Sequence, residues 1–135
     1  TVSEASGADV LEESWNIQAD ASALGFDWPD ITGVLDKIAE ELAEIRDAVG
    51  RGDMQDAGCE LGDLLLAAVN AARFIGIQPS DALRAANDRF SRRFALVKEQ
   101  ASRAGLCMRS CSLAQLDALW HEAKVRARHT LENTP

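Results

Sequence analysis

The chain has 135 residues, of which 47% are hydrophobic, enough for one domain with a buried core but too few for two. It contains no run of about 18 apolar residues and no basic segment followed by an apolar one at its start. We therefore expect a soluble, cytoplasmic protein with neither a membrane span nor a signal peptide. The net charge of −8 argues against a nucleic-acid duplex as a partner.

Five helices are predicted from the spacing of apolar residues. The first covers about 9–23 and ends before the loop "GFDWPD". The second covers about 31–49, with Asp30 as its N-cap and Gly50 and Gly52 at its end. The apolar stripe of this second helix is predicted to face the core: Leu35, Ile38, Leu42, Ile45 and Val49.

The third predicted helix covers 54–75, opened by Asp53 and closed by Gly76. The fourth begins near Ser80, directly after a proline, and stops at Gly105. One face of this fourth helix is predicted to be core: Leu83, Ala86, Phe90, Phe94, Val97 and Ala101.

The fifth predicted helix starts at Ser112, where Gln115 completes a capping-box pattern. No segment alternates with the period of a strand, and short loops between long helices make neighbours antiparallel. The sequence therefore predicts an all-α, antiparallel helical bundle of about five helices with a four-helix core. We expect a single domain over 1–135, with its core at about 10–126 and flexible termini.

The three cysteines, Cys59, Cys107 and Cys111, are an odd number without a CxxC pair. This argues against a disulfide framework and for a reducing compartment. A metal site at Cys107 and Cys111 is disfavoured, because no histidine or third cysteine stands nearby at ligand spacing.

Charge is distributed unevenly along the chain. Residues 1–63 carry 16 acidic and 3 basic side chains, whereas residues 64–135 carry 6 acidic and 11 basic ones. Two explanations remain open at this point. The halves attract each other across the bundle, or acidic residues hold a cation while basic residues hold an anion.

Carboxylates occur in i, i+3 pairs on two neighbouring helices. The second helix carries Glu41 and Glu44 in "AEELAEI", and the third carries Glu60 and Asp63 in "CELGDLL". At about 100° per residue, Glu41 flanks the apolar stripe and Glu44 points to solvent. If these helices face each other, four carboxylates converge and repel unless a cation neutralises them, and oxygen ligands suit Mg²⁺ or Mn²⁺.

The alternative for each pair is a solvated charged surface. That alternative is stronger for the second helix, where Glu40 adds a third carboxylate, because helix surfaces are rich in Glu. It is weaker for Glu60 and Asp63, because leucines surround them and Gly62 lowers helix propensity. We interpret Gly62 as the point of close helix approach.

Basic residues of the fourth helix lie in "NDRFSRRF". Arg89 and Arg93 project to the same side of Phe90 and border the core, whereas Arg92 points away. Planar guanidinium donors suit phosphate oxygens, although basic flanks on helices are common.

The fifth helix offers a second pair, Trp120 and Lys124, which are i, i+4 neighbours. These two are either a core Trp with a surface Lys, or a base-stacking ring beside a phosphate ligand. His121 and His129 have no partner pattern and are expected on the surface.

Several phrases in order and spacing resemble one known family: "GFDWPD", "EELAE", "ELGDLL", "NAARFIG", "ANDRFSRRF" and a late "LW" followed by Lys124. They are similar to the MazG nucleoside triphosphate pyrophosphohydrolases of the all-α NTP pyrophosphatase group, over about residues 10–126. The resemblance implies hydrolysis of nucleoside triphosphates to the monophosphate and pyrophosphate with Mg²⁺. It also implies a homodimer or a higher homo-oligomer.

Carried over by motif, the resemblance gives metal ligands, catalytic residues and substrate ligands. The metal ligands are Glu41, Glu44, Glu60 and Asp63. The catalytic candidates are Glu40, as an outer-shell residue or base, and Glu41. The triphosphate ligands are Arg89, Arg93 and Lys124, and Trp120 contacts the base or forms a wall of the pocket.

The chain also departs from the family pattern. Cys59 stands where relatives often have a second Glu, and Asp56 stands where they often have a Lys, a loss of positive charge that predicts altered triphosphate binding. Because the chain begins at Thr1 and shows one copy of a domain that some relatives carry twice, we expect a single-domain member or a C-terminal piece of a longer protein.

Other functions remain open as alternatives. Within the fold, these are a deoxynucleotide-specific or a phosphoribosyl-ATP pyrophosphohydrolase. From another class, the alternative is a non-enzymatic helical interaction module whose acidic face docks a basic partner. A di-iron bundle is disfavoured because the chain has no Glu-x-x-His pair.

Overall fold

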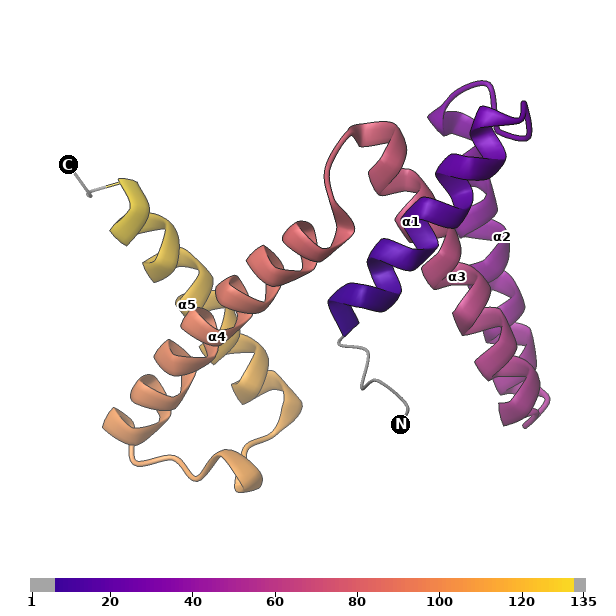
Figure 1. The fold of residues 1–135 in the computed structure, drawn as a ribbon. Helices are drawn as coiled ribbons and strands as arrows, with labels where there is room; N and C mark the ends of the chain where they lie inside the picture. Colours follow the sequence, from indigo (N-terminus) through magenta and orange to yellow (C-terminus); the bar gives the residue numbers. More distant parts are fainter. Residues whose placement is uncertain (1–6, 133–135) are drawn as a thin grey trace, which may run out of the picture. The chain divides into compact units, whose positions relative to one another are not determined.

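The computed structural model describes residues 7–132, which are helical apart from loops and one short 3-10 turn (Figure 1). The helices are α1 (Gly7–Ala23), α2 (Ile31–Gly50), α3 (Met54–Ile75), α4 (Pro79–Arg103) and α5 (Leu113–Glu132). No strand occurs in this part of the chain, so the predicted all-α class with five helices is confirmed. None of the helices within it combines the length and apolar composition needed to cross a bilayer. The termini predicted to be flexible lie outside the described residues.

Local capping interactions set the ends of the helices where the sequence predicts them. The carboxylate of Asp30 accepts a hydrogen bond from the backbone N–H of Thr32 at 2.8 Å, which caps α2. Asp53 caps α3 in the same way, by accepting from the N–H of Asp56 at 3.0 Å. At the other end of α3, Gly76 adopts the left-handed conformation, with φ of 81°.

The predicted capping box at the start of α5 is also confirmed. The backbone N–H of Ser112 donates to Oε1 of Gln115 at 2.8 Å, and the N–H of Gln115 donates to Oγ of Ser112 at 3.2 Å. Two backbone donors at this helix start are thereby satisfied.

The chain divides into two compact units at Leu83 and Arg84. In the first unit, α3 packs against both α2 and α1. In the second unit, α4 and α5 bury a small core of Val97, Ala101, Leu119 and Ala123. The expectation of a single domain stays a prediction.

The face that α2 buries differs from the predicted one. The buried residues of α2 are Val34, Glu41 and Ala48, each one position before a leucine or valine of the predicted core stripe. That stripe is about half-exposed at Leu35, Leu42 and Val49. The physical reason is that α2 packs chiefly on α3, and adjacent positions on a helix differ by about 100°. The prediction that these three residues are core is therefore wrong within this chain.

The predicted core face of α4 is only partly buried. Val97 and Ala101 are buried as expected, because α5 covers the C-terminal half of this helix. Leu83, Phe90 and Phe94, nearer its N-terminus, stay exposed. The core prediction for these three residues is wrong within this chain.

Gly62 and Gly33 differ in how closely other groups approach their backbone. A Cβ on Gly62 would meet nothing within 4 Å, so the prediction of close helix approach there is wrong. A Cβ on Gly33, by contrast, would lie 2.5 Å from Cε3 of Trp28. The indole of Trp28 therefore lies against the first turn of α2, where only glycine leaves room for it.

We predict opposite effects from alanine at two helical glycines. Gly33→Ala should lower the free energy of unfolding by about 1–3 kcal/mol, because the new methyl group displaces the Trp28 ring. Gly58→Ala should raise it by up to about 1 kcal/mol, because a Cβ there meets nothing within 4 Å and alanine favours the helix. Urea unfolding followed by circular dichroism measures both. A Gly33→Ala protein as stable as the parent would contradict this packing.

Candidate metal centre

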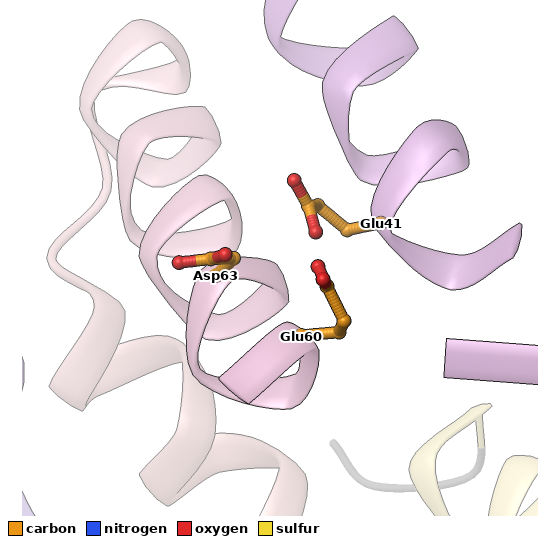
Figure 2. A group of neighbouring side chains, drawn as sticks. All are labelled: Glu41, Glu60 and Asp63. Carbon is orange, nitrogen blue, oxygen red and sulfur yellow. The ribbon is translucent and has the colours of Figure 1, made fainter. Parts of the chain in front are cut away.

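Three carboxylates from α2 and α3 converge in the first unit. One oxygen each of Glu41, Glu60 and Asp63 lies within 4.8 Å of the others. Figure 2 shows Glu41 reaching from α2 toward Glu60 and Asp63 on α3. Residues three apart on a helix share one side, so the i, i+3 spacing of Glu60 and Asp63 presents both to α2. We call these three residues the carboxylate trio.

Glu41 is the buried member of the trio, with only 2% of its surface exposed. Its Oε1 receives an ion pair from Nζ of Lys37 at 3.1 Å. Its Oε2 is buried, and among the described residues it has no hydrogen-bond partner when the neighbouring carboxylates are ionised. Because a buried carboxylate oxygen without a partner costs free energy, Glu41 presents an acceptor that a cation would satisfy.

The neighbouring carboxylates change the pKa values in this cluster. Glu41, and then Glu44, raise the pKa of Glu60 from its usual value to about 8. The pKa of Glu41 is lowered, because a hydrogen bond from Glu60 and the ammonium of Lys37 stabilise its charged form. At neutral pH without a cation, Glu60 therefore holds a proton that it shares with Glu41.

The trio fits a hard divalent cation. All its ligand atoms are carboxylate oxygens, the donors that Mg²⁺ and Mn²⁺ prefer. Lys37 and the proton on Glu60 partly offset the negative charge when no cation is bound.

The other two carboxylates predicted from the sequence, Glu40 and Glu44, lie outside the trio. Glu44 is exposed, as predicted, and stands outside the trio, although it is near enough to Glu60 to raise that pKa. Glu40 is exposed and forms an ion pair with Lys37 at 3.4 Å. Three of the four predicted metal ligands are thus brought together. Glu41 is buried rather than flanking, because its side of α2 is the one that meets α3.

Four predicted substrate residues lie in the second unit. The guanidinium of Arg93 lies 6.0 Å from the ring centroid of Trp120, within reach of a cation–π contact. The ring of Phe90 lies 5.4 Å from the same indole. Arg89 and Lys124 are exposed. The structure thus brings Arg93 and Trp120 together within this unit.

Predictions for surface residues agree with the structure. Arg92, His121 and His129 are exposed, as expected. Within the described part of the chain, neither Cys107 nor Cys111 belongs to a group of three potential metal ligands.

One departure from the family pattern has a structural explanation. Asp56 accepts from Arg51 at 2.8 Å, and Arg51 also pairs with Asp47 at 3.0 Å. These contacts tie the end of α2 to the start of α3 across a three-residue loop. Nothing in the described residues explains Cys59, which is exposed.

Sequence reasoning missed two features that position the site. Lys37 stands four residues before Glu41, the spacing of a helical ion pair, and this signal was available. The ion pair between Asp27 and Arg73 spans 46 positions and had no such signal.

The chain is thus an all-α protein with a candidate divalent-cation centre on a helical hairpin. Residues 31–97 match the family model described as the MazG nucleotide pyrophosphohydrolase domain. This segment contains the whole carboxylate trio as well as Arg89 and Arg93. The chain belongs to the MazG family.

Curated relatives carry corresponding names. The nucleoside triphosphate pyrophosphohydrolase/pyrophosphatase MazG of Thermotoga maritima is 40% identical over 115 residues, covering 85% of this chain and 44% of the relative. The nucleoside triphosphate pyrophosphohydrolase of Escherichia coli K12 is 34% identical over 117 residues, with the same two coverages. The uncharacterized protein YabN of Bacillus subtilis is 45% identical over 71 residues, covering 53% of this chain and 14% of YabN. The chain thus spans less than half the length of these relatives.

We predict that the metal-free protein loses stability as the pH rises from about 5 to 8. The folded state raises the pKa of Glu60 to about 8, so it binds more protons than the unfolded chain in this range. The contribution is fully present below the ordinary glutamate pKa and is lost as the pH rises through 8. Thermal unfolding in a chelator should show this slope, and Glu60→Gln should flatten it. Equal slopes in both proteins would rule out the shared proton.

Proposed function

We propose that this chain is an Mg²⁺-dependent nucleoside triphosphate pyrophosphohydrolase. It converts a ribo- or deoxyribonucleoside triphosphate and water to the monophosphate and pyrophosphate. The observation that carries the proposal is the convergence of Glu41, Glu60 and Asp63 in a chain of the MazG family. The names of the relatives from Thermotoga maritima and Escherichia coli support it.

The carboxylate trio would hold the cation, with Glu44 completing the set of oxygen ligands. Mg²⁺ is the proposed ion, and Mn²⁺ can substitute because it accepts the same ligands. A bound ion supplies charge neutralisation for the phosphates and lowers the pKa of the attacking water. The unpartnered Oε2 of Glu41 supports this role, since an ion would satisfy it.

Lys37 orients the carboxylates of α2 toward their separate roles. It binds Oε1 of Glu41 and Oε2 of Glu40, so the second oxygen of Glu41 would be left for the cation. Glu40 then acts as an outer-shell residue or as the base that takes the proton of the attacking water. Glu41, which holds the ion, is the other catalytic residue.

Residues of the second unit are proposed to bind the triphosphate. Arg89, Arg93 and Lys124 would stabilise the negative charge that develops on the departing pyrophosphate. Trp120 would contact the base or form a wall of the pocket. The contact between Arg93 and Trp120 supports a shared role for these two side chains.

The proposed cellular role is house-cleaning or regulation of the nucleotide pool, in the cytoplasm. The free state of Cys59, Cys107 and Cys111 supports a reducing compartment. Assaying a panel of triphosphates for pyrophosphate release would determine the preferred base and sugar. That panel also separates the general enzyme from a specialised one.

We propose that the chain assembles as a homodimer or a higher homo-oligomer. The largest fully buried side chain of the described residues is only a valine, Val34, so a single copy encloses a small core. Leu35, Leu42 and Val49 form a half-exposed apolar stripe along α2, and leucines of α3 are similarly exposed. Covering such a stripe with a second copy would remove its apolar surface from water.

We predict that Glu60→Gln and Asp63→Asn each abolish Mg²⁺-dependent release of pyrophosphate. Each change removes a charged oxygen ligand while keeping the shape of the side chain. The helical circular dichroism signal should be unchanged. Asp36→Asn, an exposed acid of α2 outside the trio, is the matched control and should keep full turnover. Full turnover in Glu60→Gln or Asp63→Asn would overturn the metal assignment.

We also predict that Leu42→Asp converts the protein to a monomer in analytical ultracentrifugation. A charge placed in the centre of the apolar stripe would have to be desolvated in the assembly. Leu24→Asp is the control, because Leu24 is 89% exposed and lies outside the stripe. Identical sedimentation of Leu42→Asp and the parent would exclude the stripe as an interface.

A further inference from the structure

An apolar cavity lies in the first unit beside the carboxylate trio. It encloses about 510 Å³, within the range of small-molecule sites, between α1, the loop after it, and α3. The residues that shape it include Ile17, Ala21, Phe26, Trp28, Leu66 and Asn70. The proposed reaction uses none of these residues.

This cavity adjoins a hollow that reaches two members of the trio, Glu41 and Asp63. A second hollow of about 340 Å³ is lined by Glu41, Asp63 and Lys37. The two hollows share Trp28 and Asn70 as lining residues, together with Gln18 and Leu66. A ligand whose charged end lies at the trio can therefore extend its other end into the apolar cavity.

The chemistry of the cavity suits an uncharged, flat group. The ionic groups at its edge, Asp27 and Arg73, form an ion pair with each other. Phe26, which is 82% exposed, and Trp28 supply aromatic surface. Gly33 leaves space for the Trp28 ring to lie against α2, which holds the indole in place.

Asn70 offers a hydrogen-bond donor in a defined orientation. It is buried, and its Oδ1 accepts a hydrogen bond from Nε of Arg73 at 3.1 Å. Because an arginine can only donate, the oxygen of Asn70 must face it. The amide nitrogen of Asn70 therefore faces away from Arg73, on a residue that lines the cavity.

Gln18 offers an acceptor by the same reasoning. Its Nε2 donates to the backbone oxygen of Leu66 at 3.2 Å, and a carbonyl oxygen can only accept. The Oε1 of Gln18 therefore remains available on a residue that lines the cavity. Each nucleobase carries a donor and an acceptor side by side on one edge, which matches this pair of amides.

We propose that this cavity binds the nucleobase of the triphosphate, with Trp28 as the stacking surface and Asn70 and Gln18 as partners of the base edge. The proposal rests on the proposed function, since it assumes that the phosphates lie at the trio. It assigns contact with the base to Trp28 instead of Trp120. Arg73 is a positioning residue, because it acts by orienting the amide of Asn70.

The test compares ligands that differ only by the base. Binding of AMP, GMP, CMP and UMP is measured by titration calorimetry with Mg²⁺ present, against ribose 5-phosphate, which has the same phosphate and no base. We expect the tightest monophosphate to bind the parent at least tenfold more tightly than ribose 5-phosphate. Trp28→Leu should weaken that monophosphate about tenfold, since it removes base stacking, and leave ribose 5-phosphate within twofold.

Further variants separate recognition from folding. Trp28→Phe keeps an aromatic surface and should recover most of the affinity lost in Trp28→Leu. Asn70→Asp keeps the shape but replaces the donor by an acceptor, and should weaken monophosphate binding about tenfold. Leu24→Ala, an exposed residue of the same loop that does not line the cavity, should change neither ligand.

The outcomes for the base cavity and for the activity are distinguishable. A Trp28→Leu protein that keeps the full difference between monophosphate and ribose 5-phosphate would overturn the cavity, even if pyrophosphate release is normal. Equal weakening of both ligands would also overturn it. Base-dependent binding at Trp28 without any pyrophosphate release would overturn the activity alone.

Discussion

A carboxylate buried between α2 and α3 is the constraint on which the rest of the first unit depends. Glu41 has 2% of its surface exposed and lies between Val34 and Ala48 on the face of α2 that meets α3. An unpaired charge at such a position would cost several kcal/mol. Lys37 stabilises one of its oxygens, and the other lies toward Glu60 and Asp63. The helix pair is therefore built around a charge that is only partly compensated, which is the condition for binding a cation.

Around this charge, the first unit separates polar from apolar chemistry. Glu41, Asp63 and Lys37 line one hollow, and the adjoining cavity is lined by Trp28 and by the ion pair of Asp27 with Arg73. Such a division matches a ligand with an anionic end and a flat, uncharged end. Within the second unit, a charged group and an aromatic ring also lie together, namely Arg93 of α4 and Trp120 of α5.

Features set by local sequence could be predicted, because their causes lie within a few residues. The caps at Asp30 and Asp53, the left-handed Gly76 and the box of Ser112 with Gln115 all act over a single turn. The i, i+3 spacing likewise placed Glu60 and Asp63 together.

Features that depend on which surfaces meet could not be predicted in the same way. Periodicity placed Leu42 on the apolar stripe of α2, but its burial requires a neighbour that α2 lacks within this chain. For the same reason, Glu41 was expected on a flank, and Gly62 was assigned a close helix approach that does not occur there. Neighbours distant in sequence set the surroundings of these residues, and single-helix geometry does not contain them.

The most direct test of this account is the binding of Mn²⁺, followed by electron paramagnetic resonance in the parent and in Glu41→Gln. If the buried carboxylate holds the cation, the parent binds Mn²⁺ and Glu41→Gln binds it at least about tenfold more weakly, with its helical signal intact. Equal affinity in the two proteins would contradict the account, because the burial of Glu41 would then have no connection with a metal ion.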